Sequence, residues 1–256
     1  MNISEPSPGN YAEIFTKRGW LYQQAMLGVP RARTLEYEQL FHAHPLQAGE
    51  HLLDVPSGGG YLAKHLDATL KVPALVRSLE FTPGFDPDVE VVDPHTPWPV
   101  AASSLQRCIC LAALHHIHDL DGFLANATNV IRPFGLLHLA DVLPGSGIMH
   151  FLEQFVDRHT STGHRGIYRN FQQLHWPSNL EVLTIETRPC PWYFDSRQQM
   201  LHFCQQLFGM DKSCQPCLEQ ALEDYIGIQH RGKGVELQWS LSYADLRRRP
   251  AVGEPL

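Results

Sequence analysis

The sequence contains no run of 18 or more apolar residues, so no transmembrane helix is expected within its 256 residues. It also lacks an excess of basic residues, because 20 Lys and Arg stand against 27 Asp and Glu, giving a net charge of −7. Binding to phosphate backbones depends on Lys and Arg, so this balance argues against nucleic acid and anionic membranes as the main partners. The N-terminal segment has no basic region and no apolar stretch of the kind found in signal peptides, and we therefore expect a cytoplasmic protein.

Cysteine is also scarce, with six residues in the chain. That number is too low for a disulfide scaffold at this length and agrees with a reducing compartment. One Cys-x-x-Cys pair, Cys214 and Cys217, has neither a second pair nor a His-x-x-x-His to complete a zinc site. We interpret it as a loop between helices, with a metal or redox role as the alternative.

Helical and extended patterns alternate along the first half of the chain. Residues 10–44 carry apolar side chains every three or four positions, and Pro30 should divide them into two helices. From residue 51 to 142, short apolar strands alternate with helices, which predicts right-handed βαβ units and a mainly parallel sheet. The predicted strands are 51–55, 74–80, 89–93, 107–114 and 136–142, and the helices between them are 61–70 and 120–132.

The pattern changes after residue 142. Two segments with period-two alternation, 180–188 and 235–243, are separated by helical patterns at 198–210 and 218–228. We predict that these strands form a late antiparallel pair at one sheet edge and that the tail from residue 247 frays. The expected division is an N-terminal helical lid (1–48) and one α/β domain (49–256), with a helical cover at 145–178 and a helical insertion at 197–230.

The segment with the clearest chemistry is LLDVPSGGGYLA, residues 52–63. Glycines between a strand and a helix let a ligand approach the backbone, because no Cβ stands in the way. The helix N-terminus offers free N–H groups, and Asp54 adds a carboxylate to the same crevice.

This segment resembles motif I of the class I S-adenosylmethionine-dependent methyltransferases, an acidic residue followed by GxGxG. Later segments match the family in order and spacing: Glu80 ends the second strand, Asp93 follows the third, LAALHH ends the fourth and VIRPFGLLHLADV contains the fifth. The resemblance implies a Rossmann-like, seven-stranded methyltransferase fold that binds S-adenosylmethionine, with Glu80 at the ribose hydroxyls and Asp93 at the adenine amine. The implied cofactor-binding residues are Asp54, Pro56, Ser57, Gly58, Gly60, Tyr61, Glu80, Phe81, Asp93, Pro94, Leu111 and His116.

The sequence departs from this family at three positions. Pro56 occupies the first glycine position of motif I, Phe134 replaces a glycine of the RPGG turn, and Gln106 stands where relatives often have Asp. Other interpretations of the same residues stay open. Asp54 could cap a helix, Asp93 could begin a Pro-rich turn, and the glycines could form only a tight turn.

A dinucleotide-binding motif is a further alternative, because Gly58-x-Gly60-x-x-Ala63 also fits GxGxxG/A, with Glu80 at the distance expected for a ribose carboxylate. The position of Asp54 inside the strand end and the lack of a second Gly-rich turn argue against it.

Methyl transfer requires positioning of the reactants and removal of one proton, which a histidine performs well near pH 7. His115 and His116 end the fourth strand, His164 follows the fifth, and Asp141 could orient a histidine or the substrate. These four are the candidate catalytic residues. Clusters at His115, His116 and His118 and at His159 and His164 leave a metal site as an alternative, but we assign no metal.

The fourth strand is not followed by the Asn/Asp-Pro-Pro-aromatic motif of relatives that methylate amino groups of bases or of glutamine side chains. We therefore expect a small-molecule or carrier-bound acceptor, methylated on oxygen or carbon. Aromatic residues in the N-terminal helices and in 145–176 are expected to cover the cofactor or to pack in the core. The alternatives are a catalytically silent binding protein and an S-adenosylmethionine-binding enzyme with different chemistry.

Overall fold

The computed structural model describes residues 11–69, 75–85, 87–251 and 253. The chain begins with α1 (Tyr11–Gly28) and α2 (Thr34–Leu40), separated at Pro30 as predicted. The alternating half that follows contains β1 (His51–Asp54), α3 (Tyr61–Thr69), β2 (Leu75–Glu80), β3 (Glu90–Val91), β4 (Leu105–Leu111), η1 (Leu114–His116), α4 (Leu120–Val130) and β5 (Ile131–Asp141). The second half contains α5 (Gly147–His150), η2 (Phe151–Val156), α6 (Asp157–His159), η3 (Phe171–Gln173), β6 (Leu180–Pro189), β7 (Trp192–Phe194), α7 (Arg197–Leu207), α8 (Gln215–Tyr225), β8 (Ile228–Arg231), β9 (Gly234–Leu237) and β10 (Ser240–Arg248).

Seven strands form one sheet in the order β3-β2-β1-β4-β5-β10-β6. Strands β1 to β5 are parallel to their neighbours, whereas β10 runs antiparallel between β5 and β6. The predicted fold class and the late antiparallel pair are therefore confirmed. Apolar clusters pack against both faces of the sheet, which explains the continuous apolar sequence of β4.

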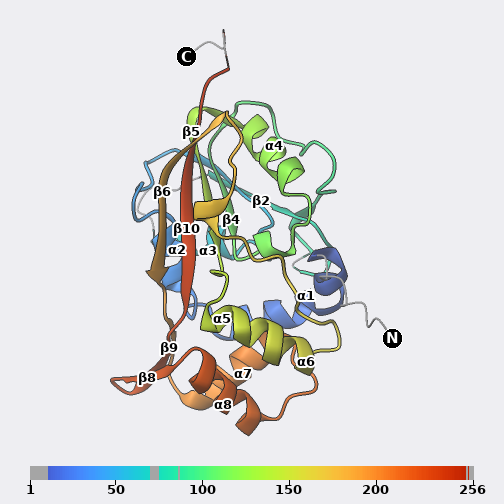
Figure 1. Cartoon of the computed structure of the whole chain (residues 1–256), viewed down its shortest axis with the longest axis vertical. Coiled ribbons are helices and arrows are strands. Elements are labelled where there is room, and N and C mark those ends of the chain that lie inside the picture. Colours follow the sequence, from blue (N-terminus) through green and yellow to red (C-terminus); the bar gives the residue numbers. More distant parts are fainter. Residues whose placement is uncertain (1–10, 70–74, 86, 252, 254–256) are drawn as a thin grey trace.

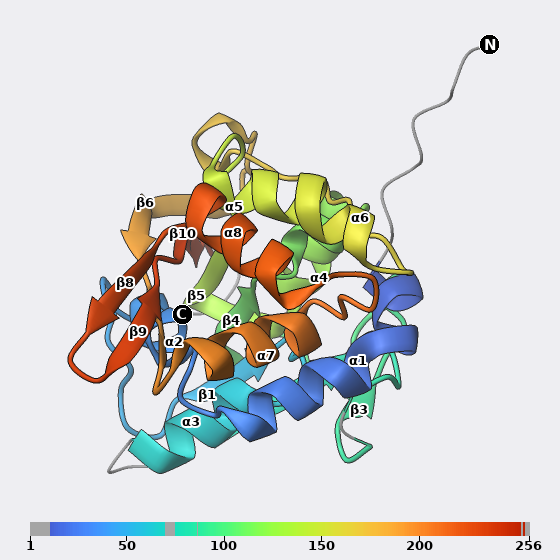
Figure 2. The same ribbon diagram turned by 90° about the horizontal axis from the view of Figure 1, so that it is seen from below.

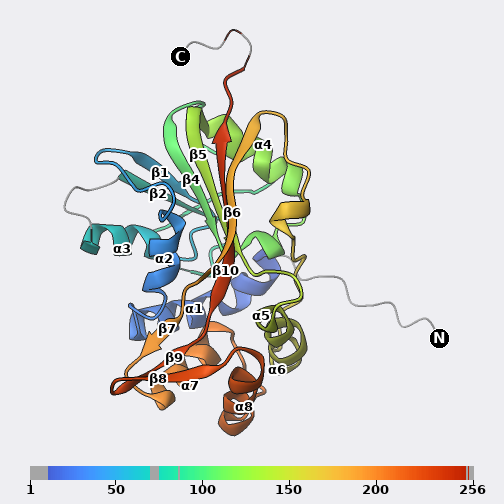
Figure 3. The ribbon, with the colours of Figure 1, turned by 60° about the vertical axis from the view of Figure 1, so that its left-hand side comes forward.

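Helices gather at the end of the sheet where the parallel strands finish. Figure 1 shows α1, α5, α6, α7 and α8 at this end, and Figure 2 shows them lying across it. Helix α4 covers one face of the sheet, whereas α2 and α3 lie on the opposite side (Figure 3). Ligand sites in open parallel sheets form at this edge, so the helices are placed to enclose one.

The predicted strand 235–243 is wrong as a single element. Residues 234–237 form β9, which pairs with β7 and β8 in a separate three-stranded antiparallel sheet. A tight turn, in which Trp239 N donates to Leu237 O at 2.7 Å, then leads into β10. Period-two alternation continues through the turn, so the sequence pattern did not mark the boundary. The predicted insertion (197–230) therefore contains two helices, as expected, and ends in β8.

The C-terminal segment is ordered further than expected. Strand β10 continues to Arg248, Arg247 forms an ion pair with Glu181 at 2.8 Å, and Arg249 N donates to Asn179 O. The prediction that the tail frays from residue 247 is thus wrong for residues 247–249.

The cysteines also differ from expectation. Cys214 and Cys217 form a disulfide at the start of α8, where Cys214 caps the helix, so the pair is not a loop between helices. The other four cysteines are free and buried.

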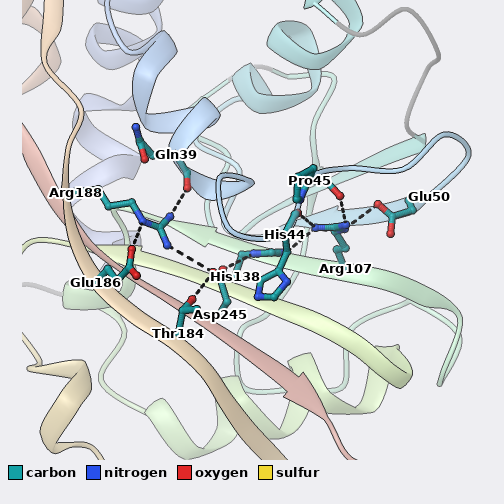
Figure 4. A network of polar contacts seen from close by, with 10 residues as sticks. All are labelled: Gln39, His44, Pro45, Glu50, Arg107, His138, Thr184, Glu186, Arg188 and Asp245. Carbon is teal, nitrogen blue, oxygen red and sulfur yellow. Dashed lines mark hydrogen bonds and ion pairs between the residues drawn. The ribbon is translucent and has the colours of Figure 1, made fainter.

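A buried polar network ties β4, β5, β6 and β10 to the segment that precedes β1 (Figure 4). His138 Nδ1 lies 2.7 Å from Asp245 Oδ1, and Arg107 lies 3.2 Å from the other ring nitrogen of His138. Arg107 also donates to the carbonyl oxygens of His44 and Pro45. None of these residues lines a cavity where the parallel strands end, so we assign the network a structural role.

Among the described helices, none combines the length and apolar character needed to cross a membrane. The cytoplasmic location and the division of the chain at residue 48 stay predictions.

Candidate functional site

The glycine-rich turn after β1 adopts the conformation that its glycines permit. Gly58, Gly59 and Gly60 have φ values of 58°, 97° and 73°, which side chains with a Cβ rarely adopt. Ser57 N donates to Leu79 O at 2.9 Å, and Gly58 N donates to Glu80 Oε2 at 2.8 Å. The turn is therefore fixed against the end of β2.

A cavity of about 490 Å³ lies beside this turn, and we call it the glycine-turn cavity. Its lining includes Asp54, Pro56, Ser57, Gly58 and Leu111 from the strand ends and Tyr11, Phe15, Tyr22, Arg33 and Tyr37 from the N-terminal region. The α1 and α2 helices thus form one wall, as expected of the N-terminal segment.

Asp54 lines this cavity with a carboxyl group that is only 3% exposed. Among the described residues, no donor forms a hydrogen bond with it. Burial, followed by the nearby charge of Glu80, raises the pKa of Asp54 well above its usual range. A buried carboxyl without a donor, facing an enclosed space, suits a cationic ligand group.

Glu80 is 1% exposed and already has partners. Its oxygens accept from Gly58 N and from Phe81 N, each at 2.8 Å, and the Tyr11 hydroxyl donates to it. Burial raises its pKa to about 7 against the lowering effect of these hydrogen bonds. Glu80 influences Asp54 but lies behind Gly58 and Tyr11, so only Asp54 lines the glycine-turn cavity.

Three other implied cofactor contacts line a second, outer cavity of about 780 Å³, namely Phe81, Pro94 and His116. Tyr11 lines both this cavity and the glycine-turn cavity. Asp93 is exposed and does not line either cavity. Its Oδ1 accepts a hydrogen bond from His95 N at 2.9 Å, so Asp93 begins a turn, which was the alternative interpretation of this residue.

Gly60 and Tyr61 do not line these cavities. Gly60 N donates to Ser57 O within the turn, and the Tyr61 hydroxyl donates to Gln23 O, which connects α3 to α1. Both residues therefore shape the site without facing it.

The candidate catalytic residues come together around a third cavity of about 480 Å³, the histidine cavity. The buried rings of His115, His116 and His164 line it, with centroids 4.1 to 5.7 Å apart. His118 is exposed, and His159 binds Phe155 O at 2.7 Å, so neither joins this cluster.

Asp141 fixes His115 through two contacts. Its Oδ1 lies 2.7 Å from His115 Nδ1, and its Oδ2 accepts from the His115 backbone N at 2.7 Å. Because an ionised carboxylate can only accept, Nδ1 carries the proton, and in the neutral imidazole Nε2 then keeps its lone pair. That Nε2 atom is buried and has no hydrogen-bond partner among the described residues. A histidine held in this way is suited to accept a proton.

The ring nitrogens of His115, His116 and His164 lie within 4.8 Å of one another, close enough to be considered as metal ligands. Burial, together with the nearby charges of Arg18 and His115, lowers the pKa of His164 well below its usual value. The same positive charge on Arg18 works against a metal ion in this place.

Sequence reasoning missed several residues of this site. Arg33 forms a buried ion pair with Glu36, whose other oxygen accepts from Trp192 Nε1 at 2.6 Å. Arg18 and Trp239 also line the histidine cavity. A signal existed for Arg18, because it lies on the same helical face as Phe15 and Tyr22, where an apolar residue is expected.

The glycine-turn cavity and the histidine cavity adjoin each other. Phe15, Tyr22, Arg33 and Ala112 line both. A ligand in one cavity could therefore react with a ligand in the other.

No model of a known protein family matches the sequence, and no curated protein is similar to it. Solved structures do resemble it. The [4+2]-cyclase SpnF is 14% identical, with a TM-score of 0.56, over 96% of this chain and 100% of SpnF. A Bacillus halodurans protein described as a methyltransferase is 15% identical, with a TM-score of 0.50, over 83% of this chain and 98% of its own.

A third similar structure is the phosphoethanolamine N-methyltransferase 2 of Haemonchus contortus in complex with phosphomonomethylethanolamine and S-adenosylhomocysteine. It is 11% identical, with a TM-score of 0.52, over 91% of this chain and 57% of that one. This chain has the class I methyltransferase fold. The fold implied by the motifs is thus confirmed, whereas the roles of individual residues in this methyltransferase fold stay proposals.

Proposed function

We propose that this chain binds S-adenosylmethionine in the glycine-turn and outer cavities and methylates a small molecule in the histidine cavity. The observation that carries the proposal is the meeting of two cavities, one containing the unpaired carboxyl of Asp54 and the other the free Nε2 of His115. When bound, S-adenosylmethionine supplies an electrophilic methyl group on a sulfonium.

The residues present fit this cofactor. Asp54 offers a buried carboxyl for its positively charged part, and the Ser57 hydroxyl is buried without a partner among the described residues. Phe81 and Pro94 provide apolar contacts for a nucleobase in the outer cavity. Glu80 could hold ribose hydroxyls only by sharing its oxygens with Tyr11, or after the Tyr11 hydroxyl moves.

The chain's own contribution to the reaction is positioning and proton removal. His115 Nε2 accepts the proton of the acceptor's hydroxyl or acidic C–H group, and Asp141 stabilises the resulting imidazolium through Nδ1. The aromatic wall around the histidines excludes water. The acceptor atom, oxygen or carbon, is part of this proposal.

The same fold occurs in a [4+2]-cyclase, so the fold alone does not fix the reaction. Pro56, which has no N–H to offer a ligand, is the feature that keeps a silent binding protein as the alternative. Calorimetry with S-adenosylmethionine and with S-adenosylhomocysteine, followed by a methyl-transfer assay, separates these possibilities.

We expect both compounds to bind the wild-type chain, and Asp54→Asn to weaken S-adenosylmethionine binding by roughly 10- to 100-fold, because a charge-assisted contact is lost. His230→Ala, which changes an exposed histidine that lines none of these cavities, is the control and should bind as the wild type does. If neither compound binds the wild-type chain, the proposal is overturned. Binding without methyl transfer from labelled S-adenosylmethionine to any of a varied panel of acceptors would favour a different reaction.

A further inference from the structure

Arg18 is a buried cation in the wall of the histidine cavity. Its side chain is 3% exposed and lies over the Phe15 ring, 5.3 Å from the centroid. One guanidinium nitrogen donates to Phe208 O at 2.6 Å, whereas Nε has no partner among the described residues. The guanidinium thus retains unused donors beside an enclosed space.

No carboxylate of the described residues neutralises Arg18. Burial lowers its pKa to about 9, and the only opposing influence is the Tyr168 hydroxyl. Arg33, in the same cavity, differs because it pairs with Glu36. Since a buried charge without a partner is costly, a protein that keeps one has a reason to do so, and a ligand anion is such a reason.

The remaining wall of the cavity is flat and apolar. The rings of Trp192 and Trp239 stack with centroids 4.2 Å apart, and Phe208 stacks on both. The Trp239 Nε1 atom is buried without a partner in the described part of the chain. Flat ring faces beside a buried cation suit a small aromatic molecule with a polar end.

The charges decide between an anion and a metal ion. The ion pair of Arg33 with Glu36 is neutral as a whole, and Asp141 lies behind His115, which it engages. Arg18 therefore gives the cavity a positive charge. Such a charge attracts a carboxylate and repels a metal cation.

We propose that the acceptor is a small aromatic carboxylic acid, held by an ion pair between its carboxylate and Arg18, with its ring against Trp192, Trp239 and Phe208. This inference rests on the proposed function where it identifies the acid as the methyl acceptor. The binding of the acid by Arg18 is a separate claim. The carboxylate is the anchoring group, and the atom to be methylated lies toward His115.

The experiment measures binding by calorimetry, with and without S-adenosylhomocysteine, for the matched pair 2-naphthoate and 2-naphthamide. We expect the wild type to bind the carboxylate roughly 10- to 100-fold more tightly than the amide. Arg18→Gln should abolish this preference, Arg18→Lys should keep part of it, and Arg31→Gln, which removes an exposed arginine charge, should leave it unchanged. Circular dichroism verifies that each variant is folded. If Arg18→Gln is not folded, Arg18→Lys replaces it as the test variant.

Equal affinity for the two probes, no saturable binding of the carboxylate at millimolar concentration, or a preference that survives Arg18→Gln would overturn the inference. A metal site is tested with Zn²⁺ alone. Stoichiometric Zn²⁺ binding that Arg18→Gln strengthens and His164→Gln removes would show that the cavity holds a cation instead. If naphthoate shows the expected preference but S-adenosylmethionine does not bind, the acid site stands and the proposed methyl transfer fails.

Discussion

Two hydrogen bonds join His115 to Asp141. The carboxylate of Asp141 accepts one from the ring nitrogen Nδ1 and one from the backbone N of His115, each at 2.7 Å. The first residue follows β4 and the second ends β5, so neighbouring parallel strands hold the pair. This arrangement fixes the ring orientation without using Nε2, and the His115 ring lines the histidine cavity.

Replacing His115 with Gln should lower kcat by roughly 100- to 10,000-fold, because the general base is lost. Affinity for S-adenosylmethionine should stay within a factor of about three, since His115 does not line the glycine-turn cavity. Single-turnover methyl transfer and calorimetry measure these two quantities. His230→Gln, a histidine-to-glutamine change at an exposed position outside these cavities, is the control. A His115→Gln variant with wild-type kcat would mean that another residue accepts the proton of the acceptor.

Asp141→Asn tests whether Asp141 acts through His115. The amide can donate to Nδ1 and so favour the wrong tautomer, leaving a protonated Nε2 toward the acceptor. We expect kcat to fall with little change in KM, and the pH dependence of kcat to lose the ionisation that His115→Gln also removes. If Asp141→Asn instead lowers the free energy of unfolding and leaves the pH profile intact, its role is structural only.

Glu80 should make the stability of the ligand-free protein depend on pH. Its folded-state pKa, raised by burial to about 7, exceeds the ordinary glutamate value of 4.5, so folding favours the protonated form. The contribution of Glu80 is therefore fully present below pH 4.5 and is lost as pH rises through about 7, a change of about 3 kcal/mol.

Urea unfolding of the wild type and of Glu80→Gln from pH 4 to 8 measures this effect. The difference in unfolding free energy between them should shift in favour of Glu80→Gln as pH rises, whatever constant offset the amide introduces. A difference that does not vary with pH would contradict the raised pKa.

Close contact between backbones holds α1 over the glycine-turn cavity. A methyl group added at Gly84 would collide with the Phe15 carbonyl oxygen and come within 3.0 Å of Thr16 Cα. Gly84→Ala should therefore destabilise the protein by about 1–3 kcal/mol and weaken cofactor binding, because backbone cannot move aside as a side chain can.

Gly28→Ala, in α1 itself, is the control for this prediction. A Cβ there meets no atom within 4 Å, so the substitution should leave stability unchanged or raise it slightly. Equal unfolding free energies for the two variants would mean that α1 is not held in this way.

The sequence predicted the parts of the site that depend on local chemistry. Asp54 at a strand end and Gly58 in a left-handed turn are fixed by neighbouring residues, so their positions could be inferred. The engagement of Glu80 by Tyr11 depends on how α1 packs, 69 positions away in the sequence, and no local pattern encodes it.

Two other differences between the predicted and the observed structure also arise from contacts between segments far apart in the sequence. The boundary between β9 and β10 was missed because a turn preserved the alternation of side chains across Trp239. His164 was predicted only as a separate candidate, although the fold brings its ring within 5.7 Å of His115. Pairing of distant segments decides both features, and a single sequence carries little information about it.

The buried network in Figure 4 offers a test of the fold away from the site. Thr184 Oγ1 donates to Asp245 Oδ2 at 2.7 Å. Burial tends to raise the pKa of Asp245, but hydrogen bonds from His138 and Thr184 outweigh it and lower the pKa. Thr184→Val should therefore reduce the free energy of unfolding by about 1–3 kcal/mol, since a hydrogen bond to a charged group is lost.

Because the folded pKa of Asp245 is lowered, the stability that it contributes is present above the ordinary aspartate value of 3.8 and is lost as pH falls through the folded value. The penalty of Thr184→Val should accordingly be full at pH 7 and shrink below pH 3.8, as urea unfolding at several pH values will show. Thr187→Val, at an exposed position of the same strand, is the control and should show no such pH dependence. An equal penalty at pH 3 and pH 7 would mean that Thr184 contributes through packing and not through the charge of Asp245.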